Sequence, residues 1–383
     1  MKKALAILMV ILMLIPTFSL AEDVVKIGVF EPASGDSGAG GKQEMLGMQY
    51  ANSIVPTVEI GGTTYKVELI YADNGSSADK APSAAQQLVS EGVSVVLGSY
   101  GSGVSIAGSQ YFADANIPAI GVTCTNPQVT MGNTHYFRIC FLDPFQGTAL
   151  ANYAFKELGA TTAYCLAELG NDYDTGLAYY FKQAFEALGG TVMSDTFPTG
   201  NSDFSSYLSN ATAIGAEVFF CPVSIAYSTQ IVNQAGGQNV TYPIMGGDTL
   251  DNNKVVESAK GTNVKLLIST FYQEGGAPEF DEGFRAWINS DQEHLTNNGG
   301  NDMVAAFPAM GYDAYFVALE ALKAAGSTDS KAVMEALWGV NYEGVTGAIA
   351  FDEIGDAKRD SAFIKTANTE TGEWEFVTVQ SVE

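Results

Sequence analysis

Two short turns carry the side chains of this sequence that are best suited to hold a small molecule. Ser102 lies in a glycine-rich turn, and Thr123 and Thr125 lie in a second turn that ends at Pro127. Each turn follows a short apolar run typical of a buried strand. If those strands are parallel, both turns open at the carboxyl edge of one sheet, where open α/β folds bind ligands. Backbone N–H groups and hydroxyls can hold a small carboxylate there, so the pattern predicts half of a ligand cradle.

The sequence gives little support for a catalytic or metal-binding site. His135 and His294 are the only histidines, and neither has the spacing of a zinc ligand or of a Ser-His pair. The turn at 98–103 lacks the G-x-G-x-x-G spacing of a dinucleotide site. We therefore expect no catalytic residue, no metal, no cofactor and no enzymatic activity. An exported hydrolase with a Ser–Lys or paired-carboxylate site is the alternative that the residues leave open.

Charge and cysteine spacing narrow the partners and the redox chemistry. The formal net charge is −25, which argues against nucleic acid or an anionic membrane surface as a partner. No cysteine has CxxC spacing, and three of the four lie in apolar, strand-like runs. We expect buried free thiols, with a bridge between the first two cysteines as the alternative. The four are Cys124, Cys140, Cys165 and Cys221.

Residues 1–21 have the pattern of a secretory signal peptide. Two lysines precede an apolar run at 4–15, and a small-x-small cleavage signature ends at Ala21. The apolar run of about 12 residues is shorter than the ~20 that a spanning helix needs, which disfavours the alternative of a membrane anchor. We expect a chain exported to the periplasm or the exterior of the cell envelope. The mature chain would begin near Glu22 and is long enough for two domains.

Apolar strand-like runs alternate with helical patterns from residue 24 to residue 272, with a break at Asp143-Pro144. Such alternation predicts parallel sheets covered by helices on both faces. No low-complexity linker separates the two halves, so we expect short ordered crossings between two lobes. Three helices without intervening strands are expected next, followed by two late strands at a sheet edge. The helices are expected at 279–292, 310–325 and 330–338, and the strands at 344–351 and 375–379.

An ordered set of motifs resembles a known family. The segments KIGVFEPASG, VVLGSYGSG, IPAIGVTCTNP and FRICFLDPFQG, followed by PIMGGDTL and VTGAIAFDEIGD, are similar to the extracytoplasmic amino-acid-binding proteins of ABC transporters. The resemblance is to the leucine/isoleucine/valine-binding type and covers essentially the whole mature chain. No single motif is decisive, and the ordered set is specific.

The resemblance implies an α/β fold of the type I periplasmic-binding-protein class. Two doubly wound parallel-sheet lobes would be joined by three crossing segments, near Asp143, near Phe271-Tyr272 and near Val345. The ligand would bind in the cleft between the lobes. The implied domains are a signal peptide at 1–21, a first lobe at 22–142 plus 273–345, and a second lobe at 143–272 plus 346–383.

The resemblance also implies an amino-acid clamp. Ser102, through its hydroxyl and N–H, would bind the α-carboxylate, and Thr125 would donate its N–H to the same group. The ammonium would donate to the Thr125 hydroxyl, to the Thr123 carbonyl, and to Asp248 from the opposite lobe, while Tyr173 would close over the ligand. This chemistry is physically reasonable, because a zwitterion leaving water needs both charges paired. Helix capping by the hydroxyls and an ordinary turn role for Asp248 are the structural alternatives.

The sequence departs from the family where the ligand's side chain would lie. The positions of a family disulfide fall near Ser76 and on Gly101, so that bridge is absent. Ser224 stands where the family has a tyrosine, and Tyr100 stands where a smaller aliphatic residue is common. These departures bear on side-chain specificity and leave the clamp intact. The residues expected to line the ligand beside the clamp are Tyr100, Cys124, Ser224 and Phe271.

The implied function is capture of a small amino acid, with a branched-chain or aliphatic side chain favoured, and delivery to an ABC permease. We expect a monomer that closes by hinge motion on its ligand. The alternative is a ligand-sensing module of the same fold that binds another small carboxylate or an amide.

Overall fold

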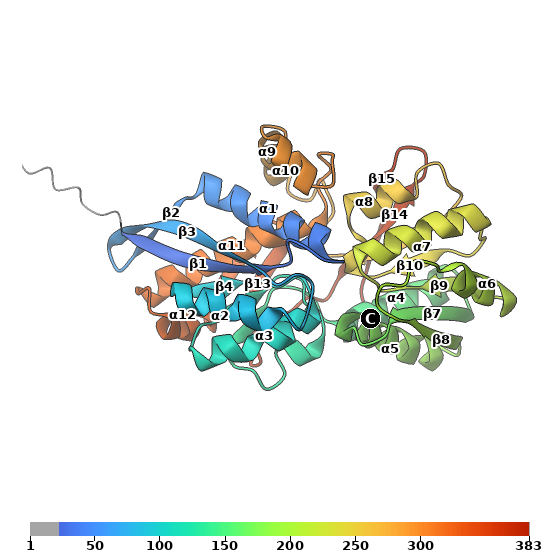
Figure 1. The fold of residues 1–383 in the computed structure, drawn as a ribbon, viewed down its shortest axis with the longest axis horizontal. Helices are drawn as coiled ribbons and strands as arrows, with labels where there is room; N and C mark the ends of the chain where they lie inside the picture. The colour runs from blue at the N-terminus through green and yellow to red at the C-terminus, as the bar shows by residue number, and fades with distance from the viewer. Residues whose placement is uncertain (1–22, 383) are drawn as a thin grey trace, which may run out of the picture.

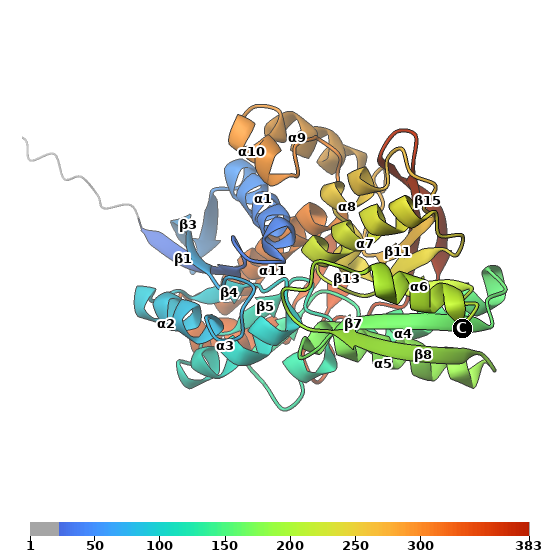
Figure 2. The same ribbon diagram turned by 45° about the vertical axis from the view of Figure 1, so that its right-hand side comes forward.

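The computed structural model describes residues 23–382. The expected signal peptide lies outside these residues. Within residues 23–382, no helix combines the length and apolar character needed to cross a membrane. Two lobes lie side by side, each built around its own sheet (Figures 1 and 2). The chain passes from the first lobe to the second, returns for helices α9 to α12, and ends in the second.

The first lobe is built on a six-stranded sheet in the order β2-β3-β1-β4-β5-β6. All neighbouring pairs are parallel except β2 and β3. Helices on both faces cover the sheet, as its apolar strands require. The strands are β1 (Val24–Glu31), β2 (Thr57–Ile60), β3 (Thr63–Asp73), β4 (Val95–Leu97), β5 (Ala119–Gly121) and β6 (Tyr136–Arg138). The helices are α1 (Gly38–Ile54), α2 (Ala81–Glu91), α3 (Ser102–Asp114), the 3-10 turn η1 (Pro127–Val129), α9 (Pro278–Ile288), α10 (Gln292–Asn297), α11 (Ala306–Ala325) and α12 (Ser330–Leu337).

The second lobe is built on a seven-stranded sheet in the order β15-β14-β11-β10-β9-β7-β8. Its core strands are parallel, and β14 and β15 add antiparallel at one edge. The strands are β7 (Thr162–Glu168), β8 (Thr191–Phe197), β9 (Val218–Phe220), β10 (Ile244–Gly246), β11 (Leu266–Thr270), β14 (Ala362–Asn368) and β15 (Glu373–Gln380). The helices are α4 (Asp143–Asn152), the π-helical η2 (Tyr153–Glu157), α5 (Asp172–Ala187), α6 (Ser205–Ala213), α7 (Ile225–Gln238), the 3-10 turn η3 (Asp248–Leu250) and α8 (Asn253–Ser258).

Two parallel-sheet lobes therefore confirm the fold class expected from the sequence. The expected late strand at 375–379 is confirmed as the edge strand β15. The strand expected at 344–351 was wrongly assigned to a large sheet. It forms β13 (Gly347–Ala350), which pairs only with β12 (Asn341–Gly344) in a separate hairpin.

The segment after this hairpin stays with the first lobe. Ile349 belongs to the core of that lobe, and the backbones of Gly355 and Ala357 each bond to Arg138 of β6 at 2.8 and 2.9 Å. We therefore propose that the third crossing lies after Ala357, later in the chain than the expected position near Val345.

Helices α1 and α11 pack with their backbones in close contact. A Cβ on Gly47 would lie 2.0 Å from the Pro308 carbonyl oxygen, and one on Gly311 would lie 2.1 Å from the Glu44 carbonyl oxygen. Only glycine fits at such a distance, so these two residues set how closely the helices approach. The contact fixes the backbone of Glu44, whose side chain bonds to Thr123 of the predicted site.

Candidate functional site

A cavity of about 530 Å³ lies between the two lobes. It is bordered by the turns that follow β4 in the first lobe and β7 in the second, both at the carboxyl ends of parallel strands. Ser102 and Tyr100 line it from the first lobe, and Tyr173 and Ser224 line it from the second. This is the position at which open α/β sheets bind ligands.

The two turns singled out in the first lobe lie together. β4 and β5 are parallel neighbours, so the turns that follow them open at one edge, as expected. The Ser102 hydroxyl accepts from the Asn126 N–H at 3.1 Å and so joins one turn to the other. Ser102 also begins α3, and the first N–H groups of a helix have no partners within the helix. These donors suit a carboxylate.

The second turn is held from below by Arg138, which the sequence analysis did not select. Its guanidinium is fully buried, donates to the carbonyl oxygens of Cys124 and Asn126, and pairs with Asp356 at 2.7 Å. A buried arginine needs such partners, because an unpaired buried charge is costly. An arginine within the apolar stretch YFRICF was the available signal. Arg138 thus fixes the backbone that presents Thr123 and Thr125.

Asp248 and Tyr173 meet in the second lobe. Asp248 begins the short turn η3 after β10, and its Oδ1 accepts from the Tyr173 hydroxyl at 2.9 Å and from Gln146 Nε2 at 2.8 Å. Its Oδ2 is buried without a hydrogen-bond partner. Burial raises the pKa of Asp248 to about 7, against the hydrogen bonds that lower it. Asp248 is 1% exposed and is not a lining residue; it reaches the cavity wall through Tyr173, which does line the cavity.

Further buried acceptors without partners gather at the same place. The Thr125 hydroxyl and both oxygens of Asp143 have no partner within hydrogen-bond distance, although Thr125 lies near enough to lower the pKa of Asp143, and one oxygen of Glu44 has only the Glu31 carboxyl beside it. Burial raises the pKa of Glu44 and of Asp143 to about 8 each. Polar groups this deeply buried are nearly always hydrogen-bonded, so such a cluster marks a place where a ligand would supply donors.

Glu44 belongs to a carboxyl pair that the sequence analysis also missed. Its Oε1 accepts a hydrogen bond from the Thr123 hydroxyl, and the carboxyl of Glu31 lies beside it. Glu31 Oε2 accepts from the Tyr100 N–H at 2.8 Å and so holds the first turn. Burial, and then the charge of Glu44, raise the pKa of Glu31 well above its usual range. An acid at the end of the apolar strand KIGVFE was the signal.

Tyr100 bridges the lobes. Its hydroxyl donates to the Thr249 carbonyl oxygen at 3.3 Å, and its ring lies edge-on to Phe307 with 5.1 Å between centroids. A Cβ on Gly40 would lie 2.3 Å from the Tyr100 ring, so the ring fills the space that a side chain would otherwise take. Phe307 was not predicted as a site residue; it lies in the first turn of α11, ahead of the helix expected at 310–325.

The remaining predicted residues separate into two groups. Ser224 lines the cavity, and its hydroxyl is buried without a partner. Cys124 and Phe271 lie within the first lobe's cores, where Cys124 packs near Gly121 and Phe271 packs on Phe141 at 4.1 Å between centroids. Neither lines the cavity, and the predicted clamp residues Thr123, Thr125 and Asp248 are not among its lining residues either. All four cysteines are free and buried, as expected.

This two-lobed architecture is shared with known proteins. The fold and the inter-lobe site define a solute-binding protein, and the profile described as "Periplasmic binding protein" matches residues 24–370. The chain belongs to that family.

Curated relatives and solved structures agree with this assignment. The Leu/Ile/Val-binding protein homolog 3 of Brucella melitensis is 28% identical over 88% of this chain and 89% of its own length. An amino acid binding protein of Pseudomonas aeruginosa is 28% identical over 93% of each chain. The leucine binding protein LivK of Thermotoga maritima is 32% identical, covers 94% of this chain and 99% of its own, and superposes with a TM-score of 0.83. LivJ of Streptococcus pneumoniae, solved with isoleucine, is 25% identical over 94% of this chain and 99% of its own, with a TM-score of 0.80.

Proposed function

We propose that this protein is the extracytoplasmic substrate-binding component of an ABC transporter and that it captures a small amino acid between its lobes. The relatives named above bind, by their names, leucine, isoleucine, valine or amino acids in general. They favour a branched-chain or aliphatic side chain. The permease is the expected partner, the protein is expected to act as an exported monomer, and no catalytic role is proposed.

The observation that carries the proposal is the distribution of unsatisfied polar groups. Asp248 Oδ2 from the second lobe and the Thr125 hydroxyl from the first are buried acceptors without partners. The ammonium of an amino acid supplies three donors, and a hydrogen bond from a charged donor is roughly twice as strong as a neutral one. The N–H groups at the start of α3 are left for the carboxylate. These groups are complementary to the two ends of a zwitterion, which supports the proposal.

Contacts that exist only when the lobes are together would couple closure to binding. Asn126 Nδ2 donates to the Asp172 carbonyl oxygen at 2.7 Å, and Asn252 Nδ2 donates to Gln43 Oε1 at 2.6 Å, each across the cleft. A ligand held by both lobes stabilises this closed form relative to an open one. The crossing segments are the natural hinges for such a motion.

Thermal unfolding with single amino acids tests the proposal. The mature protein is first unfolded and refolded to remove carried-over ligand. A ligand at 1,000 times its dissociation constant stabilises by about 4 kcal/mol, which raises the midpoint by several degrees. We expect a shift with leucine, isoleucine or valine. A shift only with a non-amine acid or an amide would retain the fold class and reject the ammonium role of Asp248, in favour of the sensing-module alternative.

A further inference from the structure

The mouth of the cleft is acidic beyond what an amino-acid clamp requires. Among the described residues that line the cavity, five are acids and none is lysine, arginine or histidine. Lys80, the nearest base along the chain, packs its side chain against Gly75 and is not one of the lining residues. The five acids are Asp36, Asp79, Glu168, Asp172 and Asp174.

One of these acids has a local explanation. The Asp172 carboxylate lies close to Gly103, where a Cβ would be 3.2 Å from Oδ2. Gly103 is in the first turn of α3, and the positive end of the helix dipole stabilises a carboxylate there. Asp172 is therefore satisfied without a ligand.

Asp36 and Glu168 compete for one donor, although Asp36 is exposed and Glu168 Oε2 separately accepts from Asn171 Nδ2 at 3.1 Å. They belong to opposite lobes, and both lie 3.3 Å from the hydroxyl of Tyr227. That hydroxyl already accepts from the Gly200 N–H at 2.8 Å, and its single proton can be donated to only one of the two carboxylates. The other carboxylate faces a like charge with no donor from Tyr227, which is unfavourable unless a cation lies nearby.

Two deeply buried polar groups beside this pair are also unpartnered and line the same cavity. The Asp174 side chain uses Oδ2 to accept from the Glu168 N–H at 3.0 Å, and its Oδ1 has no partner. The Ser224 hydroxyl has none either. Asp174 is 1% exposed and Ser224 is 5% exposed, so water satisfies neither side chain freely. Asp174 Oδ1, the Ser224 hydroxyl and whichever of Asp36 and Glu168 lacks the Tyr227 proton therefore offer unused acceptors at one end of the cavity.

We propose that this end is a second subsite that binds a cationic group. The ligands would then include α-amino acids whose side chains end in an ammonium or a guanidinium. The inference rests on the proposed function, because the α-carboxylate and α-ammonium are held by the clamp. Ser102 and Tyr173 belong to both the clamp and the cavity wall, so the two subsites are continuous. An apolar stem would pass along the Tyr100 and Tyr173 side chains while its charged end reaches the acids.

Calorimetric titration of the stripped protein with L-leucine, L-lysine and L-arginine tests the inference. We expect binding of lysine or arginine. Binding of leucine without either basic amino acid would overturn the second subsite and leave the proposed function standing. Failure of all three, together with the other aliphatic amino acids, would reject the proposed function and the inference with it.

Two substitutions locate the cation. Asp36→Asn changes an exposed residue and carries little risk to folding, and Glu168→Gln removes the buried partner. Each should lower lysine or arginine affinity about tenfold, as loss of a hydrogen bond to a charged group does, and should lower leucine affinity less. Glu335→Gln, an exposed change on α12, is the charge-matched control and should alter neither. Equal losses for leucine and lysine, or none in both variants, would overturn the assignment.

Discussion

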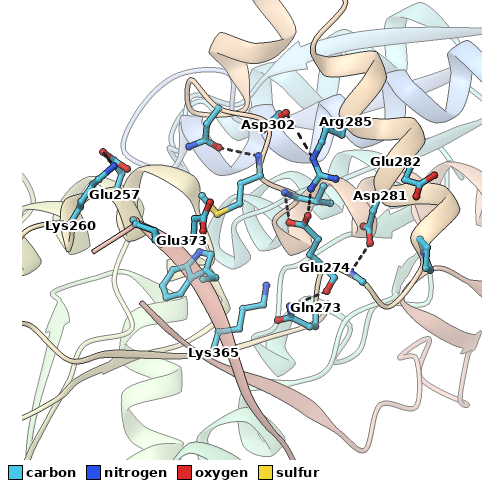
Figure 3. A pocket seen from close by; sticks show the side chains of 18 residues that line it. Glu257, Lys260, Gln273, Glu274, Asp281, Glu282, Arg285, Asp302, Lys365 and Glu373 are labelled. Carbon is cyan, nitrogen blue, oxygen red and sulfur yellow. Dashed lines mark hydrogen bonds and ion pairs between the residues drawn. The ribbon is translucent and has the colours of Figure 1, made fainter. Parts of the chain in front are cut away.

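Two cavities between the lobes are lined by many acidic residues, and they differ in whether basic residues lie among them. The cleft cavity has no basic lining residue among those described, and several buried acceptors around it lack partners. The second cavity, of about 830 Å³, is lined by residues of α8, α9, β14 and β15 and includes Lys260, Arg285 and Lys365 (Figure 3). We call it the back cavity.

Two of the acids that line the back cavity, Glu274 and Asp281, have partners within the protein. Arg285 pairs with Glu274, and the Glu274 carboxylate also accepts from the Val304 N–H at 3.1 Å (Figure 3). Asp281 accepts from the Tyr272 hydroxyl and the Gly275 N–H, both at 2.7 Å. The larger cavity therefore has the properties of a structural junction. Gln273 Oε1 and Trp374 Nε1, which line the back cavity, are also buried without partners, so the two cavities differ in how their charges are paired: basic residues line only the back cavity among those described.

The largest effect on stability is expected from the base of the back cavity. Lys365 Nζ is buried and pairs at 2.9 Å with Asp251 Oδ2, which also accepts from the Ala306 N–H at 3.2 Å. Lys365→Met leaves Asp251 as a buried charge without its cation and should lower the free energy of unfolding by about 3–5 kcal/mol. Urea unfolding of the ligand-free protein measures it. Lys260→Met, whose lysine is half-exposed, should cost under about 1 kcal/mol; similar losses in both would remove the distinction between buried and surface pairs.

Asp248→Asn should affect the cleft in the opposite way. The substitution keeps the shape and removes the charge that would face an ammonium, so amino-acid affinity should fall about 100-fold by calorimetry. The free energy of unfolding should be unchanged or higher, because a buried carboxylate with an unpartnered oxygen is removed. Retained affinity would reject the clamp, and Glu335→Gln again serves as the charge-matched control.

The cleft acids should make stability depend on pH. In this closed form burial raises the pKa of Asp248 to about 7 and those of Glu44 and Asp143 to about 8, whereas the unfolded chain has the ordinary values of 3.8 and 4.5. Between these limits the folded chain holds protons that the unfolded chain releases. The free energy of unfolding should therefore fall as pH rises from about 4 to 8, by at most about 1.4 kcal/mol per pH unit for each group.

Urea unfolding of the stripped protein at pH 5, 6.5 and 8 measures this dependence, and Asp248→Asn should flatten it. An ammonium ligand favours the ionised carboxylate, so binding near neutral pH should release protons into the buffer. Stability that rises across this range would show that the ligand-free protein in solution does not bury these acids.

The smallest effect is expected at Thr125. Thr125→Val keeps the shape and removes a hydroxyl that has no partner in the ligand-free protein. Affinity should fall about tenfold, the lower end for a hydrogen bond to a charged group, while the free energy of unfolding should not decrease. A loss of stability above about 1 kcal/mol would mean that the hydroxyl has a structural partner.

The sequence was most informative where the signal is local. Parallel strands followed by turns could be predicted from apolar runs and small residues, and Ser102 and Thr125 could be placed at one sheet edge. The glycines at 38–41 begin α1, and a Cβ on Gly41 would lie 2.3 Å from the Pro32 carbonyl oxygen. There the lack of a side chain serves close packing rather than a turn.

The features that the sequence did not predict depend on contacts between distant residues. The Arg138–Asp356 pair joins residues 218 positions apart, and it supports our proposal that the third crossing lies after Ala357 and not near Val345, as the resemblance implied. Side-chain direction was a second obstacle. Cys124 lies between Thr123 and Thr125, yet it packs in the core cluster beneath the turn, and no periodicity is available in a turn to show this.

The unpartnered acceptors of the cleft also bear on how a permease could distinguish a loaded protein from an empty one. Each buried polar group left unsatisfied costs about 1–3 kcal/mol, so several of them make empty closure rare. A gap of about 5.5 kcal/mol between empty and loaded closure is enough to reverse a 99 to 1 population ratio. Closed molecules would then be almost entirely occupied ones. The closed conformation would then indicate that a ligand is bound, and the permease would rarely dock with a ligand-free molecule.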